Sequence, residues 1–346
     1  MEVTKVYLAS PRGFCAGVVK AINALTWMVR VFPPPIYCYH EIVHNRLVVE
    51  AFEAAGVIFV DSLEEVPSGS PIMLSAHGSA PEVTEAARRL GAIVIDAVCP
   101  LVTKVHHEIK TRAQRGYTIL YVGHRGHEEA IGATAEAPQS ILLVETADEF
   151  DRLDRIDGPV AVLTQTTLAV SDWEQIAGRA ERVYPSLWKP ARLDLCYATT
   201  NRQGAVKSLA ETADSLVVIG SANSSNTRAL ERVGRELGIA RVLRVNSATE
   251  LPDDLAGIVA VTAGASAPES VVADVVAALN PSDGVAEVAT VEEDEYFPPP
   301  PELRELLSGL NAAASLLFNT KVERVRFREE SAADSLAWLV SGSTRR

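Results

Sequence analysis

The chain has 346 residues, of which 47% are hydrophobic and 22% charged, a composition typical of a folded globular protein and not of a disordered or fibrous one. At about 150 residues per domain, this length predicts two to three domains. The formal net charge of -13 repels phosphate backbones and anionic lipids, and no apolar run is long enough to cross a membrane. We therefore expect a soluble cytoplasmic protein that binds neither nucleic acid nor membrane.

A degenerate six-residue string occurs three times, beginning at Val60, Val144 and Val245. Each copy lies between two β-type runs and follows a polar loop and a helix-like segment. Strands that alternate with helical segments form parallel sheets covered by helices. The fold class we expect is therefore α/β, with three repeated units that each contain a parallel sheet.

The first unit is expected to cover residues 1–99 and the second residues 100–196. The first contains, in chain order, an N-terminal strand, the Cys15 loop, paired runs at 36–39 and 70–75, a helix over 81–90 and a strand over 93–95. The second pairs the run 117–123 with the run 158–163.

The third unit is expected to cover residues 197–281, and residues 282–346 follow it as an extension. The third unit pairs the run 215–220 with 257–261 and has helices over 226–237 and 270–279. The extension carries an acidic run at 292–295, four prolines at 298–301 and two short amphipathic segments at 303–317 and 331–340. The prolines predict an extended segment, and we expect the extension to be solvated and partly disordered.

Three of the four cysteines keep the spacing of the repeat. Cys15, Cys99 and Cys196 each follow a predicted strand, whereas Cys38 lies inside an apolar run and is expected in the core. One thiol from each unit suits a metal centre with soft ligands, although three unrelated buried thiols remain the simpler alternative. The absence of Cys-x-x-Cys disfavours structural zinc, and an iron–sulfur cluster with three thiolates would leave one iron open to a substrate oxygen.

Polar side chains gather in the loops that follow the other predicted strands. Imidazoles, hydroxyls, an amide and a helix start can together bind phosphate oxygens without lysine, and these groups come from His44, His77, His127, Ser224, Ser225, Asn226 and Ser266. Thr166 suits either a substrate hydroxyl or a helix cap. Glu129 suits either proton transfer or an ordinary helix start.

Neither the dinucleotide-binding G-x-G-x-x-G motif nor the phosphate-binding G-x-x-x-x-G-K-[ST] motif occurs in the chain. If the site performs a reduction, its electrons are therefore expected to come from a separate protein.

Eight motifs in order closely resemble the 4-hydroxy-3-methylbut-2-enyl diphosphate reductase family over residues 3–300. They are residues 11–17 (PRGFCAG), 43–46 (VHNR), 75–78 (SAHG), 96–106 (DAVCPLVTKVH), 164–168 (TQTTL), 196–203 (CYATTNRQ), 223–226 (NSSN) and 262–268 (TAGASAP). The chain departs from the family at residues 130–133 (AIGA), directly after Glu129, and beyond about residue 305.

The resemblance implies a trefoil of three α/β units around one [4Fe–4S] cluster held by Cys15, Cys99 and Cys196. It implies a diphosphate held by the three histidines and by Ser224, Ser225, Asn226 and Ser266, with Thr166 near the substrate hydroxyl and Glu129 relaying protons. The implied reaction is reductive dehydroxylation to isopentenyl and dimethylallyl diphosphate, the last step of the methylerythritol phosphate route. The implied electron donor is a ferredoxin or flavodoxin with its NADPH-dependent reductase.

Two other functions share the thiols. A cluster-dependent hydratase or lyase would use the open iron without net electron flow and would need no electron donor. An iron–sulfur sensor would keep its readout when Glu129 is changed.

Overall fold

The computed structural model describes residues 1–90, 93–318 and 331–342, which fall into two compact units. The larger unit contains residues 1–15, 44–46 and 101–294, and the smaller unit contains residues 16–43, 47–100 and the C-terminal part from Glu295. Within the described ranges, none of the helices combines the length and the apolarity that crossing a membrane requires.

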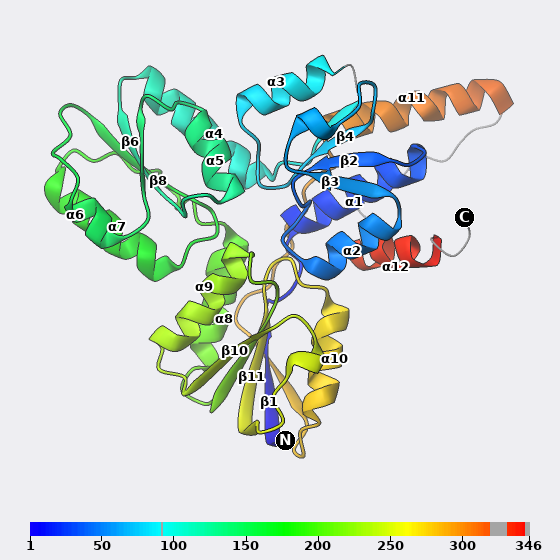
Figure 1. The fold of residues 1–346 in the computed structure, drawn as a ribbon. Helices are drawn as coiled ribbons and strands as arrows, with labels where there is room; N and C mark the ends of the chain where they lie inside the picture. Colours follow the sequence, from blue (N-terminus) through cyan, green and yellow to red (C-terminus); the bar gives the residue numbers. More distant parts are fainter. Residues whose placement is uncertain (91–92, 319–330, 343–346) are drawn as a thin grey trace. The chain divides into compact units, whose positions relative to one another are not determined.

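The larger unit contains a five-stranded parallel sheet in the order β10-β9-β11-β1-β12 (Figure 1). Its strands are β1 (Glu2–Ser10), β9 (Ser215–Ile219), β10 (Arg241–Val245), β11 (Ala256–Ala263) and β12 (Val285–Ala289). The N-terminal strand therefore lies between β11 and β12 and not in a unit of residues 1–99, and β12 adds residues of the expected extension to the same sheet. The reason is burial, because Val6 and Ala9 of β1 are fully covered on the two faces of the sheet.

Helices cover both faces of this sheet. Helices α8 (Tyr197–Leu209) and α9 (Ser225–Glu236) pack against Leu216 and Val218 of β9, while α10 (Glu269–Leu279) packs on the side of Val217 and Ile219. Successive strand residues point to opposite faces, so a strand buried on both faces reads as a continuous apolar run. This is why β9, β11 and the middle of β1 contain so few polar residues.

The larger unit also contains a three-stranded parallel sheet in the order β7-β6-β8. Its strands are β6 (Thr118–Val122), β7 (Ile141–Val144) and β8 (Val160–Thr164), and its helices are α4 (Pro100–Gln114), α5 (Glu128–Ala135), α6 (Ala147–Asp151) and α7 (Val170–Val183). Helices α4 and α5 pack on the face of Ile119 and Tyr121, and α7 packs on the face of Leu120 and Val122.

The smaller unit contains a four-stranded parallel sheet in the order β3-β2-β4-β5. Its strands are β2 (Ile36–Tyr39), β3 (Val57–Val60), β4 (Ile72–Leu74) and β5 (Val94–Asp96), accompanied by α1 (Ala16–Val31), α2 (Arg46–Ala54) and α3 (Pro81–Arg89). Cys38 is fully buried in the central strand β2, as expected for a core residue.

The threefold repeat is confirmed by the strand orders β3-β2-β4, β7-β6-β8 and β10-β9-β11, which are equivalent. The repeated string is the end of each edge strand and the start of the short helix after it, namely η1 (Leu63–Glu65), α6 and η2 (Ala248–Glu250). Its last glutamate accepts a hydrogen bond from a backbone N–H at the start of the string, as Glu65 does from Ser62, Glu149 from Glu145 and Glu250 from Asn246. The recurring sequence therefore encodes a capped strand-to-helix connection.

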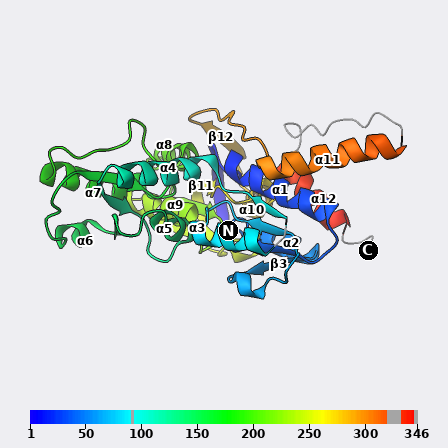
Figure 2. The ribbon, with the colours of Figure 1, turned by 90° about the horizontal axis from the view of Figure 1, so that it is seen from above.

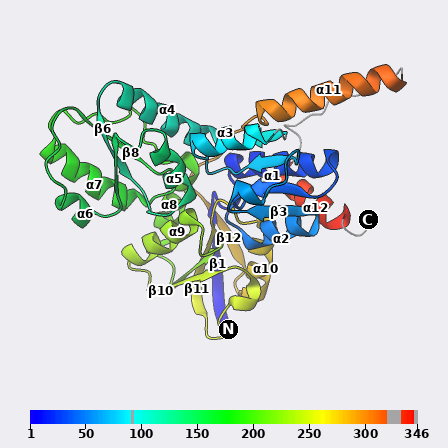
Figure 3. The same cartoon turned by 45° about the horizontal axis from the view of Figure 1, so that its top comes forward.

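Within residues 295–318 and 331–342, which belong to the expected solvated extension, the structure has two helices. Helix α11 (Pro301–Phe318) begins at the last of the four prolines, a position that needs no N–H, and α12 (Ala332–Gly342) packs against α1 (Figures 1, 2 and 3). Ser335 donates a 2.9 Å hydrogen bond to the Asn23 side chain, and the Arg30 guanidinium lies 4.8 Å from the ring centroids of both Trp27 and Trp338. The last turn of α11 remains solvated, since Leu316 is 84% exposed.

Candidate active site

The carboxyl ends of β1, β9 and β11 lie together because these strands are parallel neighbours, and their loops carry several of the expected site residues. The loop after β1 is tied to the loop after β11 by hydrogen bonds from Gly13 N to Ala263 O (3.3 Å) and from Cys15 N to Ala265 O (3.2 Å). Gly13 has a φ of +65°, and a Cβ there would lie 3.2 Å from Ala267 O. A side chain would strain this turn, so the glycine fixes the path of the chain into Cys15.

Cys196 is the N-cap residue of α8, and its sulfur lies within the first turn of that helix. The sulfur accepts a hydrogen bond from Thr199 N (3.3 Å) and lies 3.1 Å from Thr199 Oγ1. Its backbone N–H donates to Thr166 O at 3.0 Å. Burial, and after it the nearby Cys15 thiol, raises the pKa of the Cys196 thiol to about 11, against the lowering effect of the Thr199 hydrogen bonds. A neighbouring thiol that disfavours ionisation of the Cys196 thiol makes a bound cation favourable beside this sulfur.

Cys99 belongs to the smaller unit, where it follows β5 and directly precedes α4. Its backbone N–H donates to Ala76 O at 3.0 Å, so its loop runs beside the loop after β4 that carries His77. The Lys20 ammonium of α1 donates a 2.7 Å hydrogen bond to Val98 O, the carbonyl just before Cys99. Burial lowers the pKa of Lys20.

Glu129 is buried in the first turn of α5 with 2% of its surface exposed. Its two carboxylate oxygens accept hydrogen bonds from Thr166 N (2.7 Å) and Thr166 Oγ1 (3.1 Å). Burial raises the pKa of Glu129 to about 7, although the two Thr166 hydrogen bonds oppose the shift. A carboxyl group with this pKa holds and releases a proton near neutral pH.

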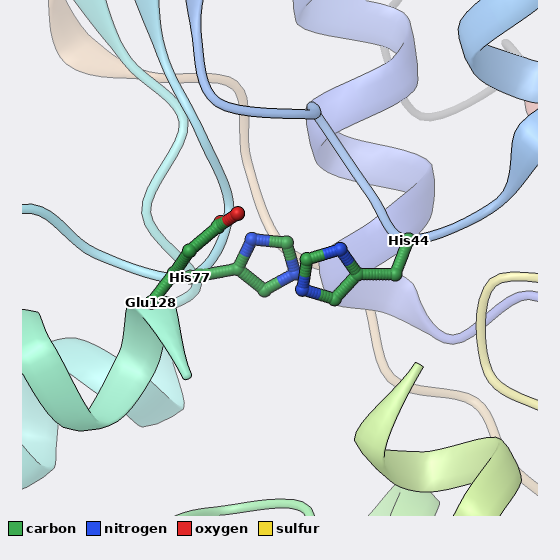
Figure 4. Close-up of side chains that lie close together, drawn as sticks. All are labelled: His44, His77 and Glu128. Atoms are coloured by element: carbon green, nitrogen blue, oxygen red, sulfur yellow. The ribbon is translucent and has the colours of Figure 1, made fainter. Parts of the chain in front are cut away.

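His44 and His127 lie with their rings edge to face, their centroids 5.4 Å apart. His127 caps α5, since its Nδ1 accepts a hydrogen bond from Glu129 N at 3.1 Å. The Ser266 hydroxyl donates to His44 O at 2.9 Å and so joins the His44 segment to the loop after β11. Figure 4 shows the chain segments that carry His44, His77 and Glu128, the last of these on the first turn of α5 beside Glu129.

The first turn of α9 presents three small polar residues. Ser224 is the N-cap and accepts from Thr227 N at 3.3 Å, and Ser225 and Asn226 follow it with 3% of their surface exposed. The Asn226 side chain is held on both sides, because its Oδ1 accepts from Ala265 N (3.0 Å) and its Nδ2 donates to Thr199 Oγ1 (3.3 Å). Free N–H groups and the helix dipole make such a start suitable for an anion.

The larger unit thus brings together most of the expected residues, which are Cys15, His44, His127, Glu129, Thr166, Cys196, Ser224, Ser225, Asn226 and Ser266. Cys99 and His77 lie on adjacent loops of the smaller unit. Three residues that the sequence analysis did not single out also belong here. Thr199 contacts the Cys196 sulfur, and the buried Arg202 forms an ion pair at 3.0 Å with the partly buried Glu293. The position of Thr199 three residues after Cys196 is a typical capping interval that could have indicated its role.

These groups divide into three chemical sets: thiols that suit a soft metal, a helix start and imidazoles that suit phosphate oxygens, and a carboxyl group that titrates near neutral pH. Together with three parallel sheets whose loops carry them, they define an α/β enzyme. The LytB protein family model matches residues 6–280. The chain belongs to the LytB protein family.

Relatives and solved structures agree with this assignment. The chain is 46% identical over 319 residues to the 4-hydroxy-3-methylbut-2-enyl diphosphate reductase of Rhodopirellula baltica, covering 90% of this chain and 100% of that protein. It is 46% identical over 309 residues to the enzyme of the same name from Cutibacterium acnes, covering 87% and 95%. The solved structure of E-1-hydroxy-2-methyl-but-2-enyl-4-diphosphate reductase from Plasmodium falciparum matches with a TM-score of 0.85 and 31% identity, over 90% of this chain and 99% of that one.

Proposed function

We propose that this chain reduces 4-hydroxy-3-methylbut-2-enyl diphosphate to isopentenyl and dimethylallyl diphosphate. The carbon–oxygen bond to the hydroxyl breaks, two electrons and two protons are consumed, and water leaves. The observation that carries this proposal is Glu129, a buried carboxyl group with a pKa of about 7 that is bonded to Thr166, whose carbonyl in turn accepts from Cys196 N. Glu129, which can carry a proton, is thereby connected through Thr166 to the backbone of Cys196.

We propose one [4Fe–4S] cluster per chain, held by Cys15, Cys99 and Cys196. The residues present fit such a group, because thiolates are the usual ligands of iron–sulfur clusters and because the Cys15 thiol disfavours ionisation of the Cys196 thiol, a cost that a metal would relieve. When bound, the cluster supplies electrons and an iron without a protein ligand that acts as a Lewis acid. The Gly13 turn, the Lys20 hydrogen bond to Val98 O and the α8 cap fix the backbones of the three ligand loops.

The diphosphate is assigned to the start of α9 and to the imidazoles. Ser224, Ser225 and Asn226 lie at the positive end of the helix dipole, and Ser266 lies on the neighbouring loop. His44, His77 and His127 add ring N–H donors, and a protonated imidazole also adds positive charge. A chain with a net charge of -13 needs such a local site to attract an anionic substrate.

Proton delivery is assigned to Glu129 acting with Thr166. The Thr166 hydroxyl lies 3.1 Å from Glu129 Oε2, so it can pass a proton between this carboxyl group and a substrate hydroxyl placed beside it. Protonation of the leaving hydroxyl turns hydroxide into water, which is a far better leaving group. The second proton, delivered to either end of the allyl system, determines which product forms.

Electrons are assigned to an external donor such as a ferredoxin or flavodoxin with its NADPH-dependent reductase. The chain contains neither of the two glycine-rich nucleotide motifs that would indicate a resident nicotinamide or nucleotide cofactor.

The test is turnover of the hydroxylated diphosphate by anaerobically purified protein with and without a chemical reductant. We expect both products only in the presence of reductant, with one water formed per two electrons. Conversion without a reductant would instead indicate a hydratase or lyase, and failure to convert the substrate in a cluster-loaded sample would contradict the proposal.

A further inference from the structure

A continuous chain of hydrogen bonds joins the start of α9 to the Cys196 sulfur within the larger unit. It runs from Ala265 N to Asn226 Oδ1 (3.0 Å), from Asn226 Nδ2 to Thr199 Oγ1 (3.3 Å), and from Thr199 Oγ1 to Cys196 Sγ (3.1 Å). At the other end of this chain of hydrogen bonds, the carbonyl of the same Ala265 accepts a hydrogen bond from Cys15 N at 3.2 Å. One amide and one hydroxyl therefore lie between two of the proposed cluster ligands.

The direction of every hydrogen bond in this chain is determined by chemistry. The backbone N–H of Ala265 can only donate, so the Asn226 oxygen faces it and the Asn226 amino group faces Thr199. The Thr199 oxygen accepts that donor, and its own hydrogen is left for the sulfur. A metal-bound thiolate can only accept, so it takes the Thr199 proton.

Burial strengthens the effect on the sulfur. Thr199 is fully buried and Asn226 is 3% exposed, so water does not compete for their donors and acceptors. The sulfur accepts from both the backbone N–H and the hydroxyl of Thr199, and a donor to an ionised acceptor is roughly twice as strong as a neutral pair.

We propose that Thr199 is a positioning residue that tunes the cluster: its hydroxyl, oriented by Asn226, donates to the Cys196 sulfur and raises the reduction potential. This inference rests on the proposed function. One-electron reduction adds negative charge to the cluster and its sulfurs, and a hydrogen-bond donor stabilises that charge. The hydroxyl therefore makes the cluster easier for an external donor to reduce.

The experiment measures the midpoint reduction potential of the anaerobically purified full chain by a titration followed by electron paramagnetic resonance. Thr199→Val removes the hydroxyl but keeps the β-branched shape and the backbone N–H. We expect the equilibrium constant for one-electron reduction to fall about tenfold, which lowers the potential by ~59 mV. Thr199→Ser keeps the hydroxyl and should keep a potential close to that of the wild type.

The neighbouring threonine provides a matched control. The Thr200 hydroxyl lies 3.1 Å from Tyr197 O and 3.4 Å from Cys196 O, both carbonyls of its own helix, and not beside the sulfur. Thr200→Val therefore makes the same substitution one residue further along α8 and should leave the potential unchanged. An unchanged potential in Thr199→Val, or an equal shift in Thr200→Val, would overturn the inference.

Cluster assembly is separated from tuning by a second pair of variants. If Thr199→Val takes up no cluster, Thr199→Ala and Thr199→Ser still differ by only the hydroxyl oxygen, and equal potentials in this pair contradict tuning. Failure of both the valine and alanine variants to load, with normal loading of the serine variant, would also overturn tuning in favour of a role in assembly. A wild-type chain that binds no cluster would contradict the proposed function itself, so the two failures are distinguishable.

Discussion

The guanidinium of Arg202 donates two hydrogen bonds to the carbonyl of Gly13, at 2.9 and 3.2 Å. Arg202 is fully buried on α8, the helix that begins after Cys196, and Gly13 lies two residues before Cys15. A single side chain thus ties the backbones of two thiol loops together. Glu293 neutralises its charge at 3.0 Å, which gives the acidic run before the prolines a structural role.

Replacing this arginine is expected to destabilise the larger unit. Arg202→Gln leaves the partly buried Glu293 carboxylate without its cation and removes at least one hydrogen bond to Gly13 O. Each hydrogen bond to a charged group contributes about 1.5–3 kcal/mol, so the loss should amount to at least this much. Denaturant unfolding should show this loss in the free energy of unfolding. Arg241→Gln, which breaks the exposed pair with Asp254, should leave the free energy of unfolding nearly unchanged, because water screens exposed charges. Similar losses in both variants would contradict the structural role of Arg202.

Glu129→Gln is expected to retain the cluster and the bound diphosphate but to lose turnover by about 10²–10⁴-fold, the usual contribution of a positioned acid or base. The amide can keep both contacts with Thr166, because its oxygen accepts from Thr166 N and its amino group donates to Oγ1. Steady-state rates with a chemical reductant provide the measurement. Glu174→Gln on α7 changes the same residue type in another helix and serves as the control. Turnover near the wild-type rate in Glu129→Gln would contradict the proton-relay role.

The same carboxyl group predicts how stability depends on pH. Burial raises the pKa of Glu129 from 4.5 to about 7, so between these values the folded chain binds more protons than the unfolded chain. Stability from this group is therefore present below pH 4.5 and is lost as the pH rises through 7. Glu129→Gln removes the loss and should be more stable than the wild type at pH 8, by up to ~3 kcal/mol. Equal stabilities of the two proteins at pH 8 would show that burial does not raise the pKa of Glu129.

The C-terminal helix is expected to stabilise the smaller unit through its contact with α1. Trp338→Ala removes one of the two rings that flank the Arg30 guanidinium and should lower the free energy of unfolding by about 1 kcal/mol or more. Val340→Ala on the same helix changes a side chain that is 64% exposed and should have little effect. Thermal or denaturant unfolding compares the two, and equal effects would mean that α12 adds no specific stability.

The sequence predicted where the strands and helices lie better than which of them pair or pack together. The strands paired across β2 and β4, β6 and β8, and β9 and β11 follow from apolar runs that are local in the chain. The pairing of β1 with β11 could not be read in the same way, because it joins residues about 250 positions apart and periodicity does not specify a partner. The docking of α12 on α1 was missed for the same reason, since Ser335 and Asn23 lie at opposite ends of the chain.

Some residues of the site could be predicted from the sequence and others could not. Residues that follow strands or start helices, such as Ser224 and Glu129, could be found from position alone. Thr199 lies at a capping interval from Cys196, whereas nothing in the local pattern around Arg202 indicates that it binds the Gly13 carbonyl 189 residues away. Glu293 lies in an acidic run whose composition predicts solvation, and only its contact with Arg202 distinguishes it from its neighbours.

The iron and sulfide content of anaerobically purified protein shows whether Cys15, Cys99 and Cys196 hold a cluster. We expect about four irons per chain in the wild type, as a [4Fe–4S] cluster requires, and loss of the intact cluster in Cys15→Ser, Cys99→Ser and Cys196→Ser. Cys38→Ser, which changes a fully buried residue of β2, should keep the full iron content. Zinc or no metal in a properly loaded wild-type sample, or loss of iron in Cys38→Ser, would contradict the account.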